Sequence, residues 1–582
     1  MFGSGHDDDL IRWSSWGEKA VRRSKEEHKP LFLYIGSPTC RLCNIEYRES
    51  FANDEVAKLL NEDFVPVRVE RESFPILSDS AMSVNRIMNG SGGWPLNLFL
   101  TPDLKPFFVS SYMPLKGTPD RPGFLDCLPR IKWLWLTENE ALVRASEEVL
   151  ESLKKSAVTE TSDIPESTLK AASEELLNDL DELWGGFGQG GKFTPVQELL
   201  FLSEYDRRTG CKRCGEALRL SLDGMSMGAI RDHLGGGFHS CTLDREWRRP
   251  RFEKLLVDQA MAAMVFAEGF DRYGKVFHWR VADETLAYAL LNLYSPGRGF
   301  LASQSYETED GDMDYYLWTS DEIDSALGEN AGLFKRAYGI TDEGNYIEET
   351  TGSPSGKNVL FLTAPLDRLA EDEGMEDEQD LEDLLAKGRQ VLSSLRRERL
   401  EPEKDGRILS DWNGFFIAAL ARCGRLMDRR NYVALAEREC SRIWSEGELF
   451  HIGDIPATLD DYAAVIWSFL ETYRSTDNMV WRERAKKLLV RCEELFGLEG
   501  RGYRLSECAG EGILFARSHG RDGLYPSGNA VMANNLVTLW ECTEEKDYRD
   551  RAIEVITSFG EGVKRVPGGY SHLLTALSRV LP

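Results

Sequence analysis

The sequence lacks any apolar run long enough to cross a membrane. None of its stretches reaches the roughly 18 consecutive apolar residues that a spanning helix needs. The N-terminus, Met1 to Asp9, is acidic and has no basic-then-apolar secretion signal. These absences predict a cytoplasmic protein that does not interact with membranes.

Cysteine and basic residues are also scarce. The chain has 11 cysteines in 582 residues, mostly isolated, which excludes a disulfide scaffold and fits a reducing compartment. It has 70 Lys and Arg against 97 Asp and Glu, so the formal net charge of −27 disfavours nonspecific binding of nucleic acid. The length exceeds what one core normally fills and predicts at least two domains.

One cysteine pair, Cys40 and Cys43, lies between a predicted strand and a predicted helix. The strand is the apolar stretch 29–35, and the helix is predicted over 43–60. A Cys-x-x-Cys at the start of a helix that follows a strand is typical of thioredoxin-type redox sites. Free backbone N–H groups at such a helix end stabilise a thiolate on the first cysteine. Alternatively, the two cysteines pack as small hydrophobic residues.

A proline downstream fits the same fold. Pro95 ends the segment Gly92-Gly93-Trp94-Pro95, which precedes two predicted strands, 96–100 and 105–109, joined by a turn. Thioredoxin folds place a cis-proline beside the active cysteines just before such a hairpin. Pro95 is therefore predicted to be cis and to shape the substrate groove.

From Thr168 onward, predicted helices alternate with turns in which glycine precedes an aromatic residue. These turns lie at 185–187, 235–238, 297–300, 447–450, 500–503 and 568–570. They recur at roughly 50 to 67 residues, except for one gap of about 150 residues. An insertion at about 301–400 accounts for that gap.

The helices between these turns fall into two series. One comprises 168–184, 215–234, 281–294, 430–446, 481–497 and 546–562, and the other comprises 195–206, 253–272, 411–427, 459–473, 528–541 and 570–581. The second series is apolar on most faces, which indicates buried helices. The pattern predicts an (α/α)6 toroid with this series inside, while an open helical solenoid is the alternative. The predicted organisation is a thioredoxin-like α/β domain at 1–153, a linker at 154–167 and an all-α toroid at 168–582.

The inner helices would start at one rim of the toroid, where polar caps and aromatic residues gather. The candidate ligand-binding residues there are His239, Trp247, Glu253, Asp258, Asp411, Trp412, Asn413, Asp461, Tyr462, Asn529 and His572. Such a composition suits a carbohydrate or similar polyol. Paired carboxylates support glycosidic chemistry, and histidines support proton transfer in a sugar epimerase. The same residue types also serve simply as helix N-caps.

A second Cys-x-x-Cys, Cys211 to Cys214, lies in a polar turn between two predicted helices. With the first pair it superficially resembles a zinc ribbon, but the separation is far outside the spacing of such sites. Neither a metal site nor a cofactor is predicted.

Both halves of the chain carry specific motifs: Trp16-Gly17-Glu18, Lys29-Pro30, Cys40-x-x-Cys43, Arg48-Glu49-Ser50-Phe51, Gly92 to Asn97, Gly235 to His239, Phe252-Glu253-Lys254, Trp412-Asn413-Gly414, Asp461-Tyr462-Ala463 and Pro526 to Asn529. Together they resemble the spermatogenesis-associated protein 20 family, whose bacterial members are the YyaL-type thioredoxin-domain proteins. The resemblance implies a thioredoxin-like domain joined to a toroid similar to sugar epimerases and six-hairpin glycosidases.

The chain departs from the family pattern at three places. The family's redox segment usually reads Cys-His-Trp-Cys-His, where this chain has Arg41, Leu42 and Asn44. Arg251 stands where a histidine usually precedes Phe-Glu-Lys, and 305–308 replaces an Asp-Ala-Asp-Ser segment. Altered redox tuning is expected, and any chemistry of the toroid is expected to be altered or absent.

The leading hypothesis is a thiol–disulfide protein whose toroid binds a carbohydrate or similar polyhydroxylated ligand. Cys40 would be the nucleophile and Cys43 the resolving thiol, acting on a partner protein. One alternative is a carbohydrate-active enzyme, either a sugar isomerase or epimerase or a glycoside hydrolase, with a scaffold-only thioredoxin domain. Another is a noncatalytic interaction protein.

Overall fold

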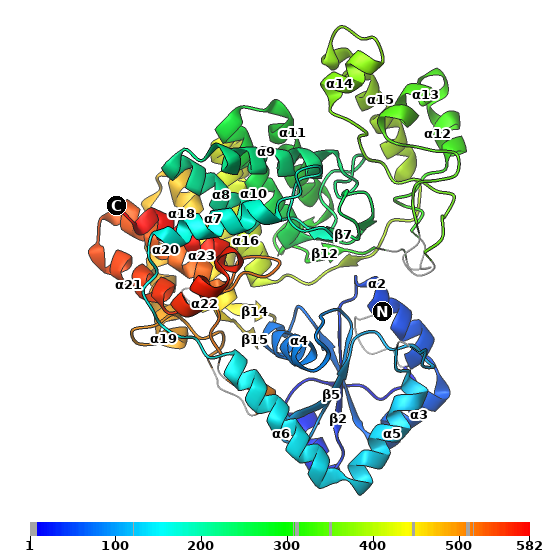
Figure 1. Ribbon diagram of the computed structural model, residues 1–582, viewed down its shortest axis with the longest axis vertical. Helices are drawn as coiled ribbons and strands as arrows, with labels where there is room; N and C mark the ends of the chain where they lie inside the picture. The colour runs from blue at the N-terminus through cyan, green and yellow to red at the C-terminus, as the bar shows by residue number, and fades with distance from the viewer. Residues whose placement is uncertain are drawn as a thin grey trace. The chain divides into compact units, whose positions relative to one another are not determined.

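The computed structural model describes residues 9–119, 121–306, 308, 313–347, 352–444, 448–507, 512–515 and 517–582. Gly447 of the predicted glycine turn and Glu307 of the 305–308 segment lie outside the described residues. The chain divides into two compact units, whose elements are labelled in Figure 1.

The N-terminal unit comprises Met1–Thr159, His451–Thr458 and Arg504–His519, as far as these ranges are described. The helical unit comprises Glu160–Phe450, Leu459–Tyr503 and Gly520–Pro582. Two segments of the range expected to form the toroid therefore belong to the N-terminal unit. Position 153, expected as the end of the first domain, lies inside helix α6 (Asn139–Ser156).

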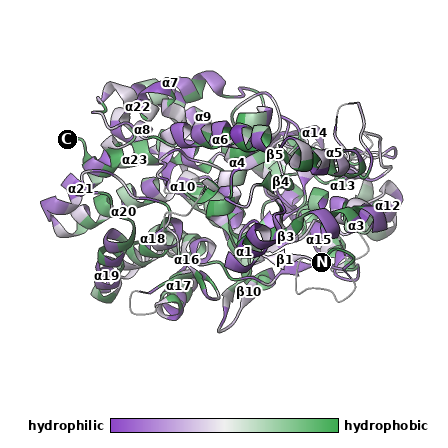
Figure 2. Ribbon diagram, turned by 90° about the horizontal axis from the view of Figure 1, so that it is seen from below, coloured by the Kyte–Doolittle hydropathy of each residue, from purple (hydrophilic) through white to green (hydrophobic). Residues whose placement is uncertain are grey.

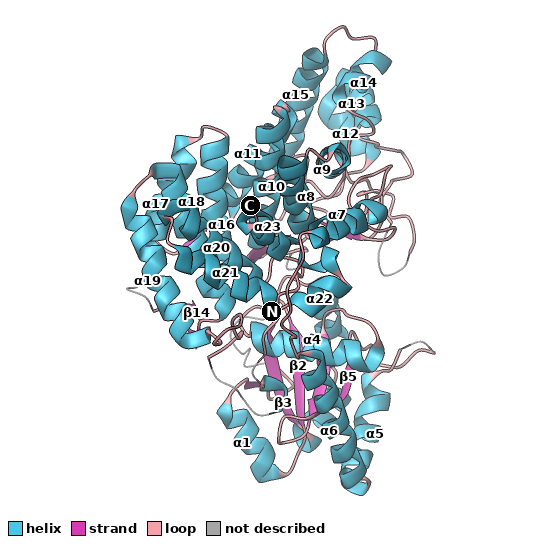
Figure 3. Cartoon of the chain, turned by 60° about the vertical axis from the view of Figure 1, so that its left-hand side comes forward, coloured by secondary structure: helices cyan, strands magenta, loops and turns pink. Residues whose placement is uncertain are grey.

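Within the described residues, the N-terminal unit contains a five-stranded sheet of order β1-β3-β2-β4-β5. Its strands are β1 (Ser14–Ser15), β2 (Leu31–Gly36), β3 (Val65–Glu70), β4 (Leu96–Leu100) and β5 (Pro106–Ser110). Strands β1 and β2 run parallel to β3, β4 is antiparallel to β2, and β5 is antiparallel to β4. Figure 3 shows these strands in magenta. This is a thioredoxin-like sheet, and it includes the predicted hairpin.

Strand β2 is buried on both faces because each face of the sheet has its own core. Leu31, Leu33 and Ile35 point to one core, which helix α4 (Pro75–Asn89) and α6 cover. Phe32 and Tyr34 point to the other, which α3 (Asp54–Asp63) and α5 (Phe124–Thr137) cover. Such alternation of side chains along a strand explains why β2 reads as one continuous apolar run. A further helix, α1 (Glu18–Glu27), precedes β2.

The predicted continuous helix over 43–60 is wrong. The chain forms α2 (Arg41–Glu46), then a π-helical turn (Tyr47–Phe51), and starts α3 anew at Asp54. The Asn53 side chain accepts hydrogen bonds from the backbone N–H groups of Glu55 and Val56, at 3.0 and 3.2 Å. Because asparagine caps helices well, a new helix begins where the apolar spacing alone predicted continuation.

The segment Arg504–His519 returns to the N-terminal unit at helix α4. Ile513 is fully buried in the core beneath α4, and its carbonyl accepts a 2.8 Å hydrogen bond from Ser80 Oγ. Arg517 forms a 2.8 Å ion pair with Asp79. The second such segment, His451–Thr458, contains most of the short hairpin β14 (Phe450–Ile452) and β15 (Ile455–Pro456). His451 Nε2 lies 2.6 Å from the Glu72 carbonyl oxygen.

All twelve predicted helices are present among the described residues. The outer series is α7 (Ser167–Asp179), α9 (Lys212–Met227), α11 (Val276–Asn292), α17 (Arg430–Ile443), α19 (Met479–Phe496) and α21 (Lys546–Thr557). The inner series is α8 (Val196–Thr209), α10 (Leu256–Tyr273), α16 (Ser410–Leu426), α18 (Leu459–Thr476), α20 (Gly528–Thr543) and α23 (Ser571–Val580). Figure 2 shows the hydropathy of these helices.

The inner helices form a closed ring. Helices α8, α10, α16, α18, α20 and α23 each contact the next, and α23 contacts α8 again. The closed (α/α)6 toroid is therefore confirmed over the open solenoid. Inner helices α10, α16, α18 and α20 are buried along most of their length, as their apolar sequences predicted.

The described residues between α11 and α16 form four further α-helices within the helical unit. They are α12 (Ser320–Leu327), α13 (Ala331–Ala337), α14 (Leu366–Asp372) and α15 (Glu378–Arg396). They share a separate apolar cluster around Trp318, Phe334 and Leu385. None of the helices in the described part of the chain combines the length and apolar character needed to span a bilayer.

Candidate functional site

The cysteine pair of the N-terminal unit lies at the start of α2. Cys40 is the N-cap residue, with extended backbone (φ −81°, ψ 116°), and is partly exposed. Cys43 lies one turn later and has no exposed surface. Both are free thiols. An accessible first cysteine and a buried second one are the arrangement that nucleophilic attack followed by resolution requires.

The surroundings of Cys43 keep it protonated. Burial, followed by the hydrogen bond and the charge of Cys40, raises the pKa of the Cys43 thiol well above its ordinary value. The Tyr34 hydroxyl donates a 3.0 Å hydrogen bond to the Cys43 carbonyl, which fixes this turn against strand β2. The Trp94–Pro95 peptide bond is cis, as predicted.

Arg71, which the sequence did not single out, is a cation whose charge interacts with both thiols. It follows β3, and its guanidinium lies 5.3 Å from the centre of the Trp94 ring, next to Pro95. Burial opposes the charge of Arg71, but Glu72 and then both cysteines raise its pKa. The Arg71 charge in turn lowers the pKa of the Cys43 thiol, in opposition to burial.

A buried carboxyl group, Glu46, lies one turn after Cys43 on α2. Its Oε1 accepts hydrogen bonds from Asn97 Nδ2 at 2.9 Å and from the Met113 backbone N–H at 2.5 Å. Its Oε2 has no hydrogen-bond partner among the described residues. Burial raises the pKa of Glu46 well above its usual range, against the two hydrogen bonds, and the charge of Cys40 adds to the rise.

Alkylation should distinguish the two thiols. Brief treatment of the reduced protein with iodoacetamide at neutral pH is expected to modify Cys40 and to spare Cys43, because Cys43 is buried and its pKa is raised. Peptide mass spectrometry reports each site, and modification of Cys43 should increase as the pH rises. Equal rates at both cysteines would contradict this description of the pair.

Replacing Glu46 with glutamine is expected to stabilise the N-terminal unit at alkaline pH. Because the folded pKa exceeds the ordinary value of 4.5, wild-type stability falls as the pH rises from about 4.5 through the folded pKa. Glutamine stays neutral and its Oε1 can accept the same two hydrogen bonds. The melting temperatures of wild type and Glu46→Gln should therefore diverge above about pH 4.5 and converge below it. The exposed change Glu55→Gln should leave the melting temperature unchanged at every pH. A gain that does not depend on pH would contradict this explanation.

In the helical unit, three side-chain amides join glycine-aromatic turns to inner helices. Asn413 accepts from the Phe300 N–H at 2.9 Å and donates to its carbonyl at 3.0 Å. Asn529 makes the same pair with Tyr503, at 2.7 and 3.0 Å. Gln259 does so with Phe238, at 2.7 and 2.8 Å. Each amide thus uses its oxygen and its nitrogen to pair with the backbone of one residue, as a neighbouring strand would. We therefore do not propose Asn413 and Asn529 as ligand contacts.

The other candidates at the starts of α16 and α18 are also buried. Asp461 Oδ1 accepts a 3.0 Å hydrogen bond from the Asp411 N–H, and thus caps the neighbouring helix. Trp412 is buried, and the Tyr462 ring packs edge-on against Phe496. The start of α20 lies beside that of α18, since a Cβ on Gly528 would touch Leu459. Trp412, Asp461 and Asn529 therefore lie at one end of the ring, as predicted, and Asp461 and Asn529 make hydrogen bonds to backbone there.

Two successive glycine turns each contain a buried ion-pair group of the same kind, one around Asp232 and the other around Asp181. Asp232 accepts from the N–H groups of Leu234 and Gly235, and Lys254 Nζ bonds to its Oδ2 at 2.7 Å. Arg396 completes the group at 2.9 Å from Oδ1. Asp181 repeats this pattern with Lys192 at 2.7 Å and Arg245 at 2.8 Å.

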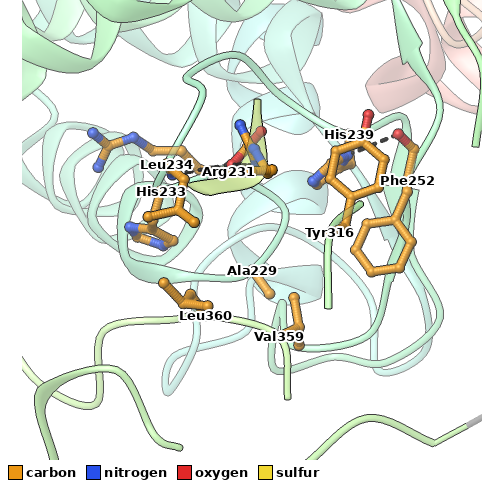
Figure 4. Close-up of a pocket in the computed structure, with 11 residues that line it drawn as sticks. Ala229, Arg231, His233, Leu234, His239, Phe252, Tyr316, Val359 and Leu360 are labelled. Atoms are coloured by element: carbon orange, nitrogen blue, oxygen red, sulfur yellow. Dashed lines mark hydrogen bonds and ion pairs between the residues drawn. The ribbon is translucent and has the colours of Figure 1, made fainter. Parts of the chain in front are cut away.

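His239 lies beside the Asp232 group and not in an open bowl. The pocket there has a volume of only about 20 Å³, about enough for one water molecule. Figure 4 shows His239 with Tyr316 and Phe252, whose carbonyl lies 3.0 Å from His239 Nδ1. Burial, and then the charge of Lys254, lowers the pKa of His239 to about 3, so the ring is neutral.

The remaining candidates of this region differ in exposure. Trp247 is fully buried, and its indole N–H donates to the Trp184 carbonyl at 2.9 Å. It leaves no room at Gly186 (φ +71°), where a Cβ would lie 2.6 Å from the Trp247 ring. Glu253 and Asp258 are half-buried, and Glu253 Oε2 accepts from Ser240 at 3.1 Å.

A larger cavity, here called the axial cavity, lies inside the ring and has a volume of about 270 Å³. Every inner helix contributes to it. Its lining residues are Leu200, Glu204, Arg207, Glu268, Arg422, Trp467, Glu471, Arg474, Asn534, Asn535, Thr538, Glu541, His572, Thr575 and Arg579. Of the predicted ligand-binding residues, His572 lies here. The charged members lie within the last two turns of their helices, at the opposite end from the predicted rim.

The second Cys-x-x-Cys repeats the local geometry of the first. Cys211 is the N-cap residue of α9 and partly exposed, and Cys214 is buried. Burial, followed by the hydrogen bond with Cys211, raises the pKa of Cys214. This pair must be removed from any assay of Cys40 and Cys43.

Comparison with known proteins gives relatives over almost the whole chain. Residues 2–154 match the family model Thioredox_DsbH, whose description reads "Protein of unknown function, DUF255". Spermatogenesis-associated protein 20 of Homo sapiens is 32% identical over 621 residues, which cover 98% of this chain and 78% of that protein. The Rattus norvegicus protein of that name is 32% identical over 624 residues, covering 98% and 79%.

Among solved structures, the chain is similar to a D-mannose isomerase and to a cellobiose 2-epimerase. The isomerase gives a TM-score of 0.40 at 9% identity, covering 67% of this chain and 84% of that chain. A cellobiose 2-epimerase from Spirochaeta thermophila gives 0.42 at 12% identity, covering 71% and 97%. The closed ring itself follows from the contacts between its own inner helices.

Proposed function

This chain belongs to the spermatogenesis-associated protein 20 family, and from that premise and its own geometry we propose that it is a thiol–disulfide oxidoreductase. The observation that carries the proposal is the pair at the start of α2, with Cys40 accessible and Cys43 buried in the same turn. The partner is a protein disulfide, which docks at Cys40.

Each residue around the pair has a role in this chemistry. Cys40 attacks the substrate disulfide, and Cys43 resolves the mixed disulfide. Arg71 favours the ionised form of Cys43, and Pro95 lines the groove in which the substrate chain lies. Glu46 provides a buried carboxyl group on the same helix as the resolving thiol.

We propose further that the ring binds a carbohydrate or a similar polyhydroxylated ligand. The specific support is the axial cavity, which is polar, partly enclosed by six helices and close in volume to small-ligand pockets. The described cysteines are free thiols, in keeping with a reducing compartment, and the cytoplasm is the proposed location.

Turnover of a protein disulfide tests the oxidoreductase proposal. The full chain carrying Cys211→Ser and Cys214→Ser should reduce insulin with a dithiol as electron donor, faster than the dithiol alone. The same chain with Cys43→Ser should not turn over, while Cys127→Ser should be unaffected. A rate equal to that of the dithiol alone would leave the N-terminal unit as a scaffold.

A further inference from the structure

His572 is a buried imidazole that the ring's own contacts do not satisfy. It is 4% exposed, and neither ring nitrogen has a hydrogen-bond partner among the described residues. Buried polar groups are normally paired, and an unpaired one is destabilising. Since His572 lines the axial cavity, a molecule in that cavity can supply the missing partners.

The backbone holds His572 in place independently of its side chain. Asp522 Oδ2 accepts a 2.8 Å hydrogen bond from the His572 N–H, and Asn534 Nδ2 donates a 2.8 Å bond to the His572 carbonyl. The Trp467 ring lies 5.5 Å from the imidazole, centre to centre. The ring is thus positioned without use of its nitrogens.

The protonation state of His572 follows from its surroundings. Burial, and then the charges of Arg422 and Arg579, lowers the pKa of His572 to about 3. The imidazole is therefore neutral at physiological pH, with one N–H donor and one acceptor nitrogen. Hydroxyl groups, which both donate and accept, complement such a ring.

The charged groups of the cavity are already paired with one another. Arg422 bonds to Glu268 at 2.7 Å, and Arg579 bonds to Glu541 at 2.6 Å. Four arginines and four glutamates line the cavity, so their formal charges cancel. An anionic ligand would have to compete with these glutamates for the arginines, whereas a neutral ligand would not.

We propose that the axial cavity binds a neutral polyhydroxylated ligand of about monosaccharide size, with His572 as its central hydrogen-bonding group. The size follows from the volume of about 270 Å³, at the lower end of small-ligand pockets. The proposal rests on the proposed carbohydrate binding of the ring, and names its site and ligand class.

Calorimetry of the full chain with neutral hexoses and myo-inositol, and with glucuronate and glucose 6-phosphate, tests this. At least one neutral compound of the panel should bind, and His572→Phe should lower its affinity about tenfold or more, since two buried hydrogen bonds are lost. Thr575→Val, on the cavity wall, should also weaken it. Thr543→Val is the matched control, because both threonines bond the carbonyl four residues earlier but Thr543 lies outside the lining. Melting curves verify that each variant is folded.

The outcomes separate the site from the proposed function of the ring. Binding of a neutral sugar that His572→Phe and Thr575→Val leave unchanged would overturn the axial site and keep carbohydrate binding. Binding confined to glucuronate or the phosphate would overturn the neutral class. Binding by no member of the panel would overturn both, and the thiol assay would be unaffected.

Discussion

Replacing Cys40 with serine is expected to reduce disulfide turnover to the uncatalysed background, whereas Cys43→Ser should stop the reaction after its first step. In that step the Cys40 thiolate attacks one sulfur of the substrate disulfide, the substrate S–S bond breaks, and the departing thiolate takes up a proton. Cys43 then attacks Cys40 Sγ and breaks the bond between Cys40 and the substrate, and the proton that Cys43 loses passes to the departing substrate thiolate. A Cys40–Cys43 disulfide forms, the second substrate thiol is released, and two electrons have passed to the substrate.

Mass spectrometry with a peptide disulfide resolves the two variants. Cys43→Ser should accumulate a covalent peptide adduct at Cys40, and Cys40→Ser should accumulate none, because Cys43 is buried with a raised pKa. Both variants carry Cys211→Ser and Cys214→Ser, so that the pair of α9 does not contribute. Turnover retained by Cys40→Ser, or an adduct at Cys43, would contradict the assigned roles.

Removing Asp232 is expected to produce the largest loss of stability in the helical unit. Asp232→Ala would leave Lys254 and Arg396, whose side chains are almost fully buried, without their counter-ion. Breaking a buried pair in this way costs about 3–5 kcal/mol in the free energy of unfolding. Asp271→Ala, an exposed change on α10, should stay within about 0.5 kcal/mol. Denaturant unfolding of both variants gives the comparison.

The pH dependence of this effect is also defined. Burial opposes ionisation, but Arg396 and Lys254 hold the pKa of Asp232 well below its usual 3.8. The stabilisation is therefore present above about pH 3.8 and is lost as the pH falls through the folded pKa. The difference between wild type and Asp232→Ala should shrink in acid. A constant difference at all pH values would assign the loss to packing instead.

Much of the fold could be predicted because its signals are local. Helical spacing and the apolar inner series identified all twelve helices of the toroid, and Pro95 before the hairpin identified the thioredoxin-like sheet. The return of Arg504–His519 to the N-terminal unit could not be predicted, since it depends on contacts such as Ile513 with Ser80, far apart in the sequence. Asn53 did carry a capping signal that the apolar spacing concealed.

The candidate site of the ring was harder to predict for a physical reason. Asparagine or aspartate at a helix start looks the same in sequence whether it faces a ligand or pairs with distant backbone, as Asn413 does with Phe300. The residues of the axial cavity carried a different signal. Glu268, Arg422 and Glu471 are charged positions within otherwise apolar inner helices, and such positions indicate a polar interior.

The most direct test of the central claim is a redox titration of Cys40 and Cys43. The full chain with Cys211→Ser and Cys214→Ser is equilibrated in buffers of reduced and oxidised dithiothreitol, alkylated, and analysed by peptide mass spectrometry. We expect one two-electron transition, in which Cys40 and Cys43 lose alkylation together and appear as a linked disulfide peptide. Two thiols that remain separately alkylated in the most oxidising buffer would contradict it.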